Sequence, residues 1–302
     1  MKQQKLVSFA KAGLKALKVA INEAETAYKK NFVPIAGAVV ATNGNVLGRG
    51  HNQRVGNFPV LHGETSCLYN MQDISKIDWE KTVFATTLSP CIMCFSLINY
   101  LRKKGLKHIV VGLGKAKGFQ GTAKTLEKLN LKVVSLAHPK SLEMMEGFAK
   151  KYPKIWDADI GELPANNKFR RKFPFQKKEI EEYFKRTKEL IEKGKYSIAS
   201  LVVGKNKEIL GESNDLREKF GDNPVYSSVM MAIGKAGSHI NIKDTALFVF
   251  SQSRKRKIDE KLFGEVSVGV CQLFRPAYVV SNKPLIEDLK KKLEKFKIKL
   301  IN

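Results

Sequence analysis

The amino-acid sequence predicts an α/β protein in which a mixed central sheet lies between two layers of helices, with this arrangement present in two tandem copies. Segments of β-strand composition alternate with segments of helical periodicity, as expected for layered α/β folds. Asn43 and Gly44 mark a tight hairpin, which places an antiparallel pair inside the sheet. The pattern of residues 33–48 recurs at residues 196–211, which indicates an internal duplication.

The first copy is expected to begin with an amphipathic helix, because apolar residues recur at steps of three and four over residues 9–29. Runs of apolar and β-branched residues then predict five strands, at 33–40, 46–50, 82–87, 106–111 and 131–136. Further helices are expected at 62–72, from Pro90 onward, at 122–130 and at 142–152. Pro90 suits a first helical position, where its missing N–H would have no partner in any case.

Residues 163–175 hold two prolines, two asparagines and a basic cluster, which indicates a linker between a first domain, 1–162, and a second, 176–302. Ile180, Phe184, Thr187 and Ile191 mark a helix face in the second domain. Where the first domain has His-Gly-Glu at 62–64, the second offers Val-Tyr-Ser-Ser-Val at 225–229. Its counterpart of the cysteine segment, 251–257, contains no cysteine, so this copy is predicted to be degenerate and to lack metal ligands.

Composition narrows the function classes. No apolar run approaches the ~20 residues of a membrane helix, so no membrane association is expected. Four cysteines are too few for a disulfide framework, and a close pair that can bind metal favours a reducing, cytoplasmic setting. The net charge is +25, but only ten of the 54 cationic residues are arginine and the lysines are spread along the chain. A solvated lysine surface is therefore favoured over a nucleic-acid platform.

One constellation carries chemistry: His62 and Glu64, followed by Cys91 and Cys94 directly after Pro90. H-x-E followed by P-C-x-x-C is the signature of zinc-dependent nucleobase deaminases. The two cysteines lie one helical turn apart, so both sulfurs can point to one side. Three protein ligands leave the fourth position of a catalytic zinc open for water. One Zn²⁺ per chain is therefore predicted, in the first domain, with zinc-bound hydroxide as nucleophile and Glu64 as proton shuttle.

Other interpretations of the same residues remain open. A lone C-x-x-C is also found in redox pairs and in structural zinc sites. A structural site would need a fourth ligand, for which His51, His108 and Cys67 are the candidates. Cys67 and Cys271 otherwise fit small buried hydrophobic residues.

At these motifs residues 1–162 resemble the fungal-type free-base cytosine deaminases of the cytidine deaminase-like superfamily. The similar segments are 33–35, 46–52, 61–64, 86–91 and 156–162. The resemblance implies that superfamily's α/β/α fold and the hydrolysis of cytosine to uracil and ammonia in pyrimidine salvage. It also implies that the tail at 156–162 covers the bound base.

The resemblance further implies a set of substrate contacts. Asn52 would hydrogen-bond the edge of the pyrimidine ring, and the Gly63 backbone N–H would hold its carbonyl oxygen. The Ser89 carbonyl and the Asp159 carboxylate would accept hydrogen bonds from the exocyclic amine that leaves. Apolar contacts would come from four side chains: Phe119 on the face of the base, Trp156 and Ile160 in the lid, and Ile35 in the floor.

Two questions of partners follow. The main alternative is a nucleic-acid enzyme, a tRNA adenosine or RNA cytidine deaminase that uses the basic surface, although a tail over the pocket would obstruct a flipped-out base. Members of the family that residues 1–162 resemble commonly pair as dimers. The degenerate copy is therefore expected either to take the partner's place within one chain or to accompany a homodimer, and a mass in solution near 33.9 kDa would favour the first arrangement.

Overall fold

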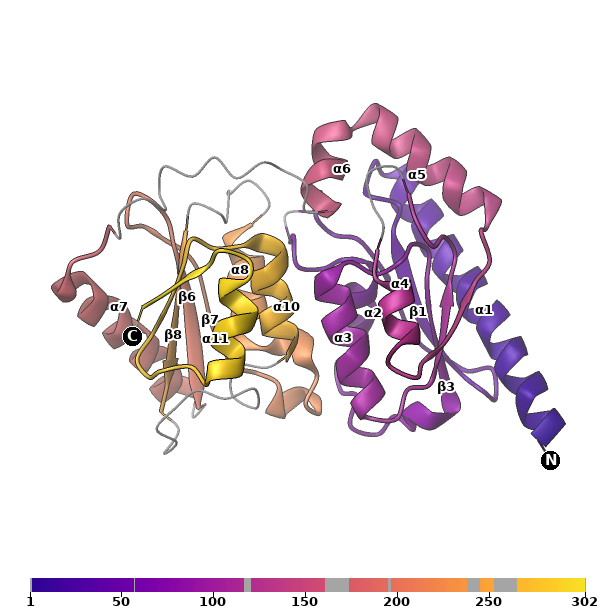
Figure 1. The fold of residues 1–302 in the computed structure, drawn as a ribbon, viewed down its shortest axis with the longest axis horizontal. Helices are drawn as coiled ribbons and strands as arrows, with labels where there is room; N and C mark the ends of the chain where they lie inside the picture. The colour runs from indigo at the N-terminus through magenta and orange to yellow at the C-terminus, as the bar shows by residue number, and fades with distance from the viewer. Residues whose placement is uncertain are drawn as a thin grey trace. The chain divides into compact units, whose positions relative to one another are not determined.

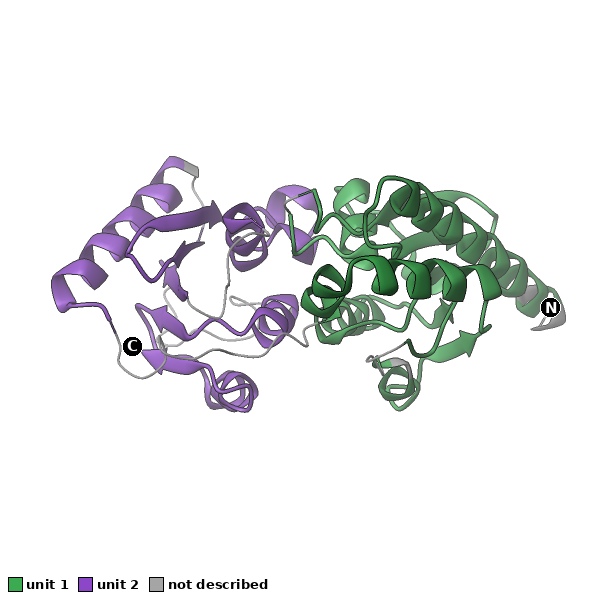
Figure 2. Ribbon diagram, turned by 90° about the horizontal axis from the view of Figure 1, so that it is seen from above, with its two compact units in different colours: residues 1–162 green, residues 163–302 purple. Residues whose placement is uncertain are grey.

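The computed structural model describes residues 2–56, 58–116, 121–160, 174–194, 197–237, 245–252 and 265–301. The chain forms two compact units, unit 1 at Met1–Glu162 and unit 2 at Leu163–Asn302, coloured separately in Figure 2. Each unit contains a five-stranded sheet with parallel and antiparallel neighbours and helices on its faces. The predicted α/β class with mixed sheets is therefore confirmed.

The sheet of unit 1 has the strand order β2-β1-β3-β4-β5. Its strands are β1 (Ala36–Ala41), β2 (Val46–His51), β3 (Thr82–Thr86), β4 (His108–Val111) and β5 (Lys132–Ser135). β1 is antiparallel to both β2 and β3, whereas β4 and β5 continue the sheet in parallel. The β1–β2 hairpin turns at Gly44, whose φ of 93° lies in the region that favours glycine.

Helices cover both faces of this sheet (Figure 1). α1 (Lys2–Lys29) packs on one face, where its apolar stripe, including Ala16, Leu17 and Ile21, meets buried residues of β1, β3 and β4. α5 (Pro139–Lys151) adds Met144 to the same core. The other unit 1 helices are α2 (Gly63–Met71), α3 (Ile92–Lys103), α4 (Ala123–Glu127), α6 (Pro153–Ile160) and the short 3₁₀ helix η1 (Trp79–Lys81). α2 lies against β1 and β2 and is the helix that brings His62 to the sheet.

Several boundaries differ from the sequence prediction. α1 begins at Lys2, earlier than the expected residue 9. α3 begins at Ile92 rather than at Pro90, because the Pro90 carbonyl accepts hydrogen bonds from the Thr122 backbone N–H and hydroxyl instead of starting the helix. The tail that was expected to cover the bound base contains a helix, α6, which was not predicted.

Unit 2 repeats this topology, with the strand order β7-β6-β8-β9-β10. Its strands are β6 (Ile198–Val203), β7 (Ile209–Asn214), β8 (Ala246–Ser251), β9 (Tyr278–Ser281) and β10 (Lys299–Ile301). Its helices are α7 (Lys177–Gly194), α8 (Ser228–Ala236), α10 (Glu265–Phe274) and α11 (Glu287–Glu294), with 3₁₀ helices η2 (Glu218–Phe220) and η3 (Pro224–Tyr226). The register of β6 with β7 shifts between Val202 and Val203, as that of β1 with β2 does between Val39 and Val40.

The predicted linker, 163–175, lies mostly outside the described residues, but its last residue does not behave as linker. Phe175 is buried in the core of unit 2, where its ring meets the rings of Tyr183 and Phe248 edge-on. The second folded segment therefore begins before residue 176. None of the helices in the described part of the chain combines the length and the apolar character that a membrane crossing demands.

Candidate active site

In unit 1, the residue directly before α2 and the residue directly before α3 are both candidate metal ligands. His62 is the N-cap of α2 and Cys91 is the N-cap of α3, both with extended backbone. The first helical hydrogen bonds run from Ser66 N to His62 O and from Phe95 N to Cys91 O. Neither ligand side chain caps its own helix, so the imidazole and the thiol are free to face each other.

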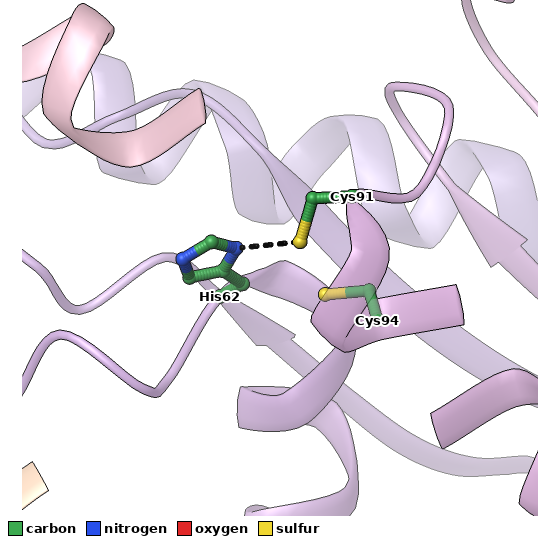
Figure 3. A group of neighbouring side chains, drawn as sticks. All are labelled: His62, Cys91 and Cys94. Atoms are coloured by element: carbon green, nitrogen blue, oxygen red, sulfur yellow. Dashed lines mark hydrogen bonds between the residues drawn. The ribbon is translucent and has the colours of Figure 1, made fainter. Parts of the chain in front are cut away.

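Figure 3 shows the imidazole of His62 pointing toward the two sulfurs, which α3 presents from its start. Within the described residues, His62, Cys91 and Cys94 form a group whose ligand atoms all lie within 4.8 Å of one another, and all three residues are buried. His62 Nδ1 lies 3.5 Å from Cys91 Sγ. One imidazole nitrogen and two sulfurs are the donor set that zinc takes in tetrahedral catalytic sites, so the residues fit this metal.

The electrostatics of the cluster favour a thiolate. A hydrogen bond from the Cys94 thiol holds the pKa of Cys91 well below its usual value against the effect of burial, and His62 lowers it further. Burial and the neighbouring Cys91 sulfur raise the pKa of Cys94. Burial by itself lowers the pKa of His62, but Asp159 and Cys91 outweigh it and raise that pKa to about 9. The Cys91 thiolate would therefore supply negative charge to a divalent cation bound between these residues.

Glu64 lies on the first turn of α2, two residues after His62, and is 2% exposed. Its Oε1 accepts a 2.9 Å hydrogen bond from the Thr86 hydroxyl at the end of β3. Burial, followed by the Cys91 charge, raises the pKa of Glu64 to about 7. A carboxylate with this pKa can accept and return a proton near neutral pH. Thr86 was not predicted as a site residue, although it lies in a segment that the resemblance covers.

A pocket with about 250 Å³ of empty space, counted out to its open mouth, connects these groups. It is lined by Ile35, His62, Glu64, Leu88, Ser89, Cys91, Asp159 and Ile160. Seven of these were predicted site or metal residues, from four separate segments, and Leu88 was not predicted. Asp159 comes from the last turn of α6, in the tail that the family resemblance implied as the lid.

Asp159 is held by two side chains from the loop that follows β2. The Asn52 amide Nδ2 donates to Asp159 Oδ1 at 2.8 Å, and Arg54 Nε donates to the same oxygen at 3.1 Å. His62 Nε2 lies 3.6 Å from this oxygen and has no hydrogen-bond partner among the described residues. Sequence reasoning missed Arg54, because its partner lies 105 residues away in the chain.

The remaining predicted contacts occupy different places. Asn52 is fully buried, and its Oδ1 accepts from the Arg54 backbone N–H. Gly63 lies so close to β1 that an added Cβ would fall 2.5 Å from Ala36 Cα. Trp156 packs in the apolar cluster with Val33, Leu113 and Phe148 and is not among the pocket-lining residues. Phe119 lies outside the described residues.

Unit 2 places other side chains at the corresponding points. Ser227 is the N-cap of α8, as His62 is of α2, so Ser228 and Val229 stand where unit 1 has Gly63 and Glu64. The Ser228 hydroxyl lies 2.8 Å from that of Ser200 on β6, and Ser267 donates to Ser227 at 3.1 Å. Two pairs of serine hydroxyls therefore lie at this point of unit 2.

Comparisons with known proteins agree with the geometry of unit 1. The family model of the cytidine and deoxycytidylate deaminase zinc-binding region matches residues 11–113. The chain is 34% identical over 149 residues to a cytosine deaminase of Candida albicans, which covers 49% of this chain and 96% of that protein. It is 32% identical over 101 residues to a tRNA-specific adenosine deaminase of Streptococcus pyogenes, which covers 32% of this chain and 60% of that protein.

A solved structure of a guanine deaminase from Nitrosomonas europaea aligns with 17% identity and a TM-score of 0.37, over 45% of this chain and 83% of that chain. The similarity to the Candida protein extends over almost all of that protein. The zinc-binding region that matches includes His62, Cys91 and Cys94. The chain therefore belongs to the cytidine and deoxycytidylate deaminase family.

Proposed function

We propose that this protein hydrolyses cytosine to uracil and ammonia in the pocket of unit 1. The observation that carries the proposal is the convergence on one small pocket of a three-residue metal-ligand group, the buried acid Glu64 and the carboxylate Asp159. The reaction adds water across the C4–N bond of the ring, forms a C4–O bond and releases the exocyclic amine as ammonia. Each of these groups has a role in that reaction.

A zinc ion held by His62, Cys91 and Cys94 would act as a Lewis acid that makes water a nucleophile near neutral pH. The chain's own residues move the protons. Glu64 takes a proton from the attacking water and delivers it to the ring nitrogen next to C4, and it assists the departing amine in the same way. Its pKa of about 7 suits both transfers. Leu88, Ile35 and Ile160 supply apolar walls that limit the access of bulk water.

Recognition of the amine falls to Asp159 and Ser89. Both line the pocket, and we propose that the Asp159 carboxylate and the Ser89 carbonyl accept hydrogen bonds from the exocyclic amine of cytosine. Asn52 and the Gly63 N–H would hold the ring edge and the carbonyl oxygen. The similarity to the Candida cytosine deaminase supports this choice of base.

Two observations favour a second candidate function. The chain is also similar to a tRNA-specific adenosine deaminase and carries a net charge of +25. A nucleic-acid substrate would need the pocket to admit a flipped-out base together with its flanking nucleotides. Asp159 and Ile160 at the end of α6 lie over the pocket and would obstruct that route, so we place this function second.

The test is ammonia release from purified protein across a panel of free bases, nucleosides and tRNA. Cytosine is expected to react, and the Glu64→Gln protein is expected to keep its zinc while losing about 10²–10⁴-fold in rate. Release from tRNA adenosine without release from cytosine would establish the second candidate instead. Turnover by Glu64→Gln at the wild-type rate would remove Glu64 from the mechanism.

Unit 2 is proposed to be a non-catalytic copy of the same fold. Its strand order, its strand directions and the position of its irregular β6–β7 register correspond to those of unit 1. Ser227 and Val229 stand in place of the ligand His62 and the acid Glu64.

A further inference from the structure

Arg54 connects two parts of unit 1 that are far apart in sequence. It lies in the loop after β2, and its Nε donates to Asp159 Oδ1 in the last turn of α6. The Arg54 side chain is 11% exposed and that of Asp159 is 1% exposed. A guanidinium this well buried is not a solvated surface charge, and its pairing with a buried carboxylate fixes both groups.

The contacts of Asp159 divide unequally between its two oxygens. Asn52 Nδ2 and Arg54 Nε both donate to Oδ1, and His62 Nε2 approaches the same atom. Within the described residues, no protein donor is recorded on Oδ2, while Asp159 lines the pocket. The loop therefore occupies one oxygen and leaves the other for a ligand.

The corresponding arginine of unit 2, Arg217, pairs with a residue of its own loop. Arg217 follows Asp215 by two residues, as Arg54 follows Asn52, and it donates through Nε and Nη2 to the carboxylate of Asp215. That pair lies within one loop. In unit 1 the corresponding position is the amide of Asn52, and the carboxylate comes instead from α6, 105 residues away. The arginine of unit 1 is therefore directed to α6, whose residues Asp159 and Ile160 line the pocket.

We propose that Arg54 is a positioning residue, which anchors the last turn of α6 over the pocket and aims Asp159 Oδ2 at the exocyclic amine of the substrate. The inference rests on the proposed function for the identity of that amine. Its effect on the reaction passes through Asp159. Because Asp159 Oδ1 also faces His62 Nε2, the same anchor orients the imidazole, as carboxylates do for metal-binding histidines.

The kinetic test compares Arg54→Gln and Arg54→Lys with the matched control Arg217→Gln, each assayed per bound zinc. Arg54→Gln is expected to lower kcat/KM for cytosine by about 10–100-fold, mostly in kcat, since the amine gains positive charge as it leaves. Arg54→Lys keeps the charge but not the fork of donors, and an intermediate loss is expected. Arg217→Gln should retain the wild-type value.

A double-mutant cycle with Asp159→Asn tests the route of the effect. If Arg54 acts through Asp159, the double variant will be no slower than Asp159→Asn alone. Independent, multiplying losses would overturn the proposal, as would wild-type kinetics in Arg54→Gln. If Arg54→Gln does not fold, Arg54→Lys decides in the same cycle.

Hydrogen exchange separates this inference from the proposed function. Amides of α6, residues 153–160, are expected to exchange faster in Arg54→Gln than in wild type, and at the wild-type rate in Arg217→Gln. Unchanged exchange in α6 would overturn the anchor. If the wild-type protein fails to deaminate cytosine while α6 still loosens in Arg54→Gln, the anchor stands and only the substrate is wrong.

Discussion

Gly63→Ala is the sharpest perturbation of the candidate site, because the added atom would meet backbone. A Cβ at this position would lie 2.5 Å from Ala36 Cα and 2.7 Å from Ala36 C and N, whereas ordinary Cβ contacts lie at 3.4–4 Å. To relieve this contact, the start of α2 would have to move away from β1 by about 1 Å, because the closely packed interior has no spare room for the added atom. His62 is the residue before Gly63 and would move with it.

The expected size of the effect follows from that displacement. Overpacking of this kind costs about 1–3 kcal/mol of stability. A metal site tolerates ligand errors of only about 0.2 Å, so His62 would no longer match the two sulfurs on α3. A misplacement of about 1 Å at the chemistry costs about 10²-fold in rate. Gly63→Ala should therefore lose zinc affinity and activity together.

Zinc affinity by chelator competition, thermal unfolding and ammonia release from cytosine measure these effects. The matched control is Gly44→Ala in the β1–β2 turn, where φ is 93° and no heavy atom lies within 4 Å of the added Cβ. Its backbone strain should cost about 1–3 kcal/mol while zinc binding and rate stay at wild-type levels. A Gly63→Ala protein that binds zinc and turns over like the wild type would refute the reasoning.

Two further predictions concern the metal and its ligands. Removing zinc with a chelator should abolish ammonia release and lower the unfolding temperature, and added zinc should restore both; a metal-free protein with full activity would contradict the site. In the zinc-free protein, the pKa of His62 is about 9 against an ordinary 6.5, so its stabilising effect is fully present below pH 6.5 and is lost as pH rises through 9. Thermal unfolding across that window checks this, with His62→Asn as the variant that should show no such loss.

Much of the fold could be predicted because its signals are local. The Asn43-Gly44 turn and the apolar runs of β1 and β6 lie within short windows, and the recurrence of those windows indicated two similar units. α6 was missed because it is short and depends on packing: Trp156 lies in a cluster with residues from four other segments. The start of α3 was misplaced because the Pro90 carbonyl bonds to Thr122, a contact between distant residues.

The residues of the candidate site were likewise predictable only where their signals are local in the sequence. His62, Cys91 and Cys94 were predicted because their spacing matches a helix turn and a known signature, and the structure brings their ligand atoms together. Arg54 and Thr86 were not predicted, since each acts through a side chain that only the fold places beside it. Long-range partners of buried charges leave no periodic trace in the sequence.

At position 62, directly before α2, the residue that would stabilise the helix differs from the residue that the chemistry requires. In unit 2, Ser227 accepts a hydrogen bond from Met230 N and so caps α8, whereas His62 gives α2 no such bond. An unfilled cap of this kind costs about 0.5–2 kcal/mol. A screen that rewards thermal robustness alone would therefore favour serine over histidine there, and would erase the imidazole from the first unit while improving its melting behaviour.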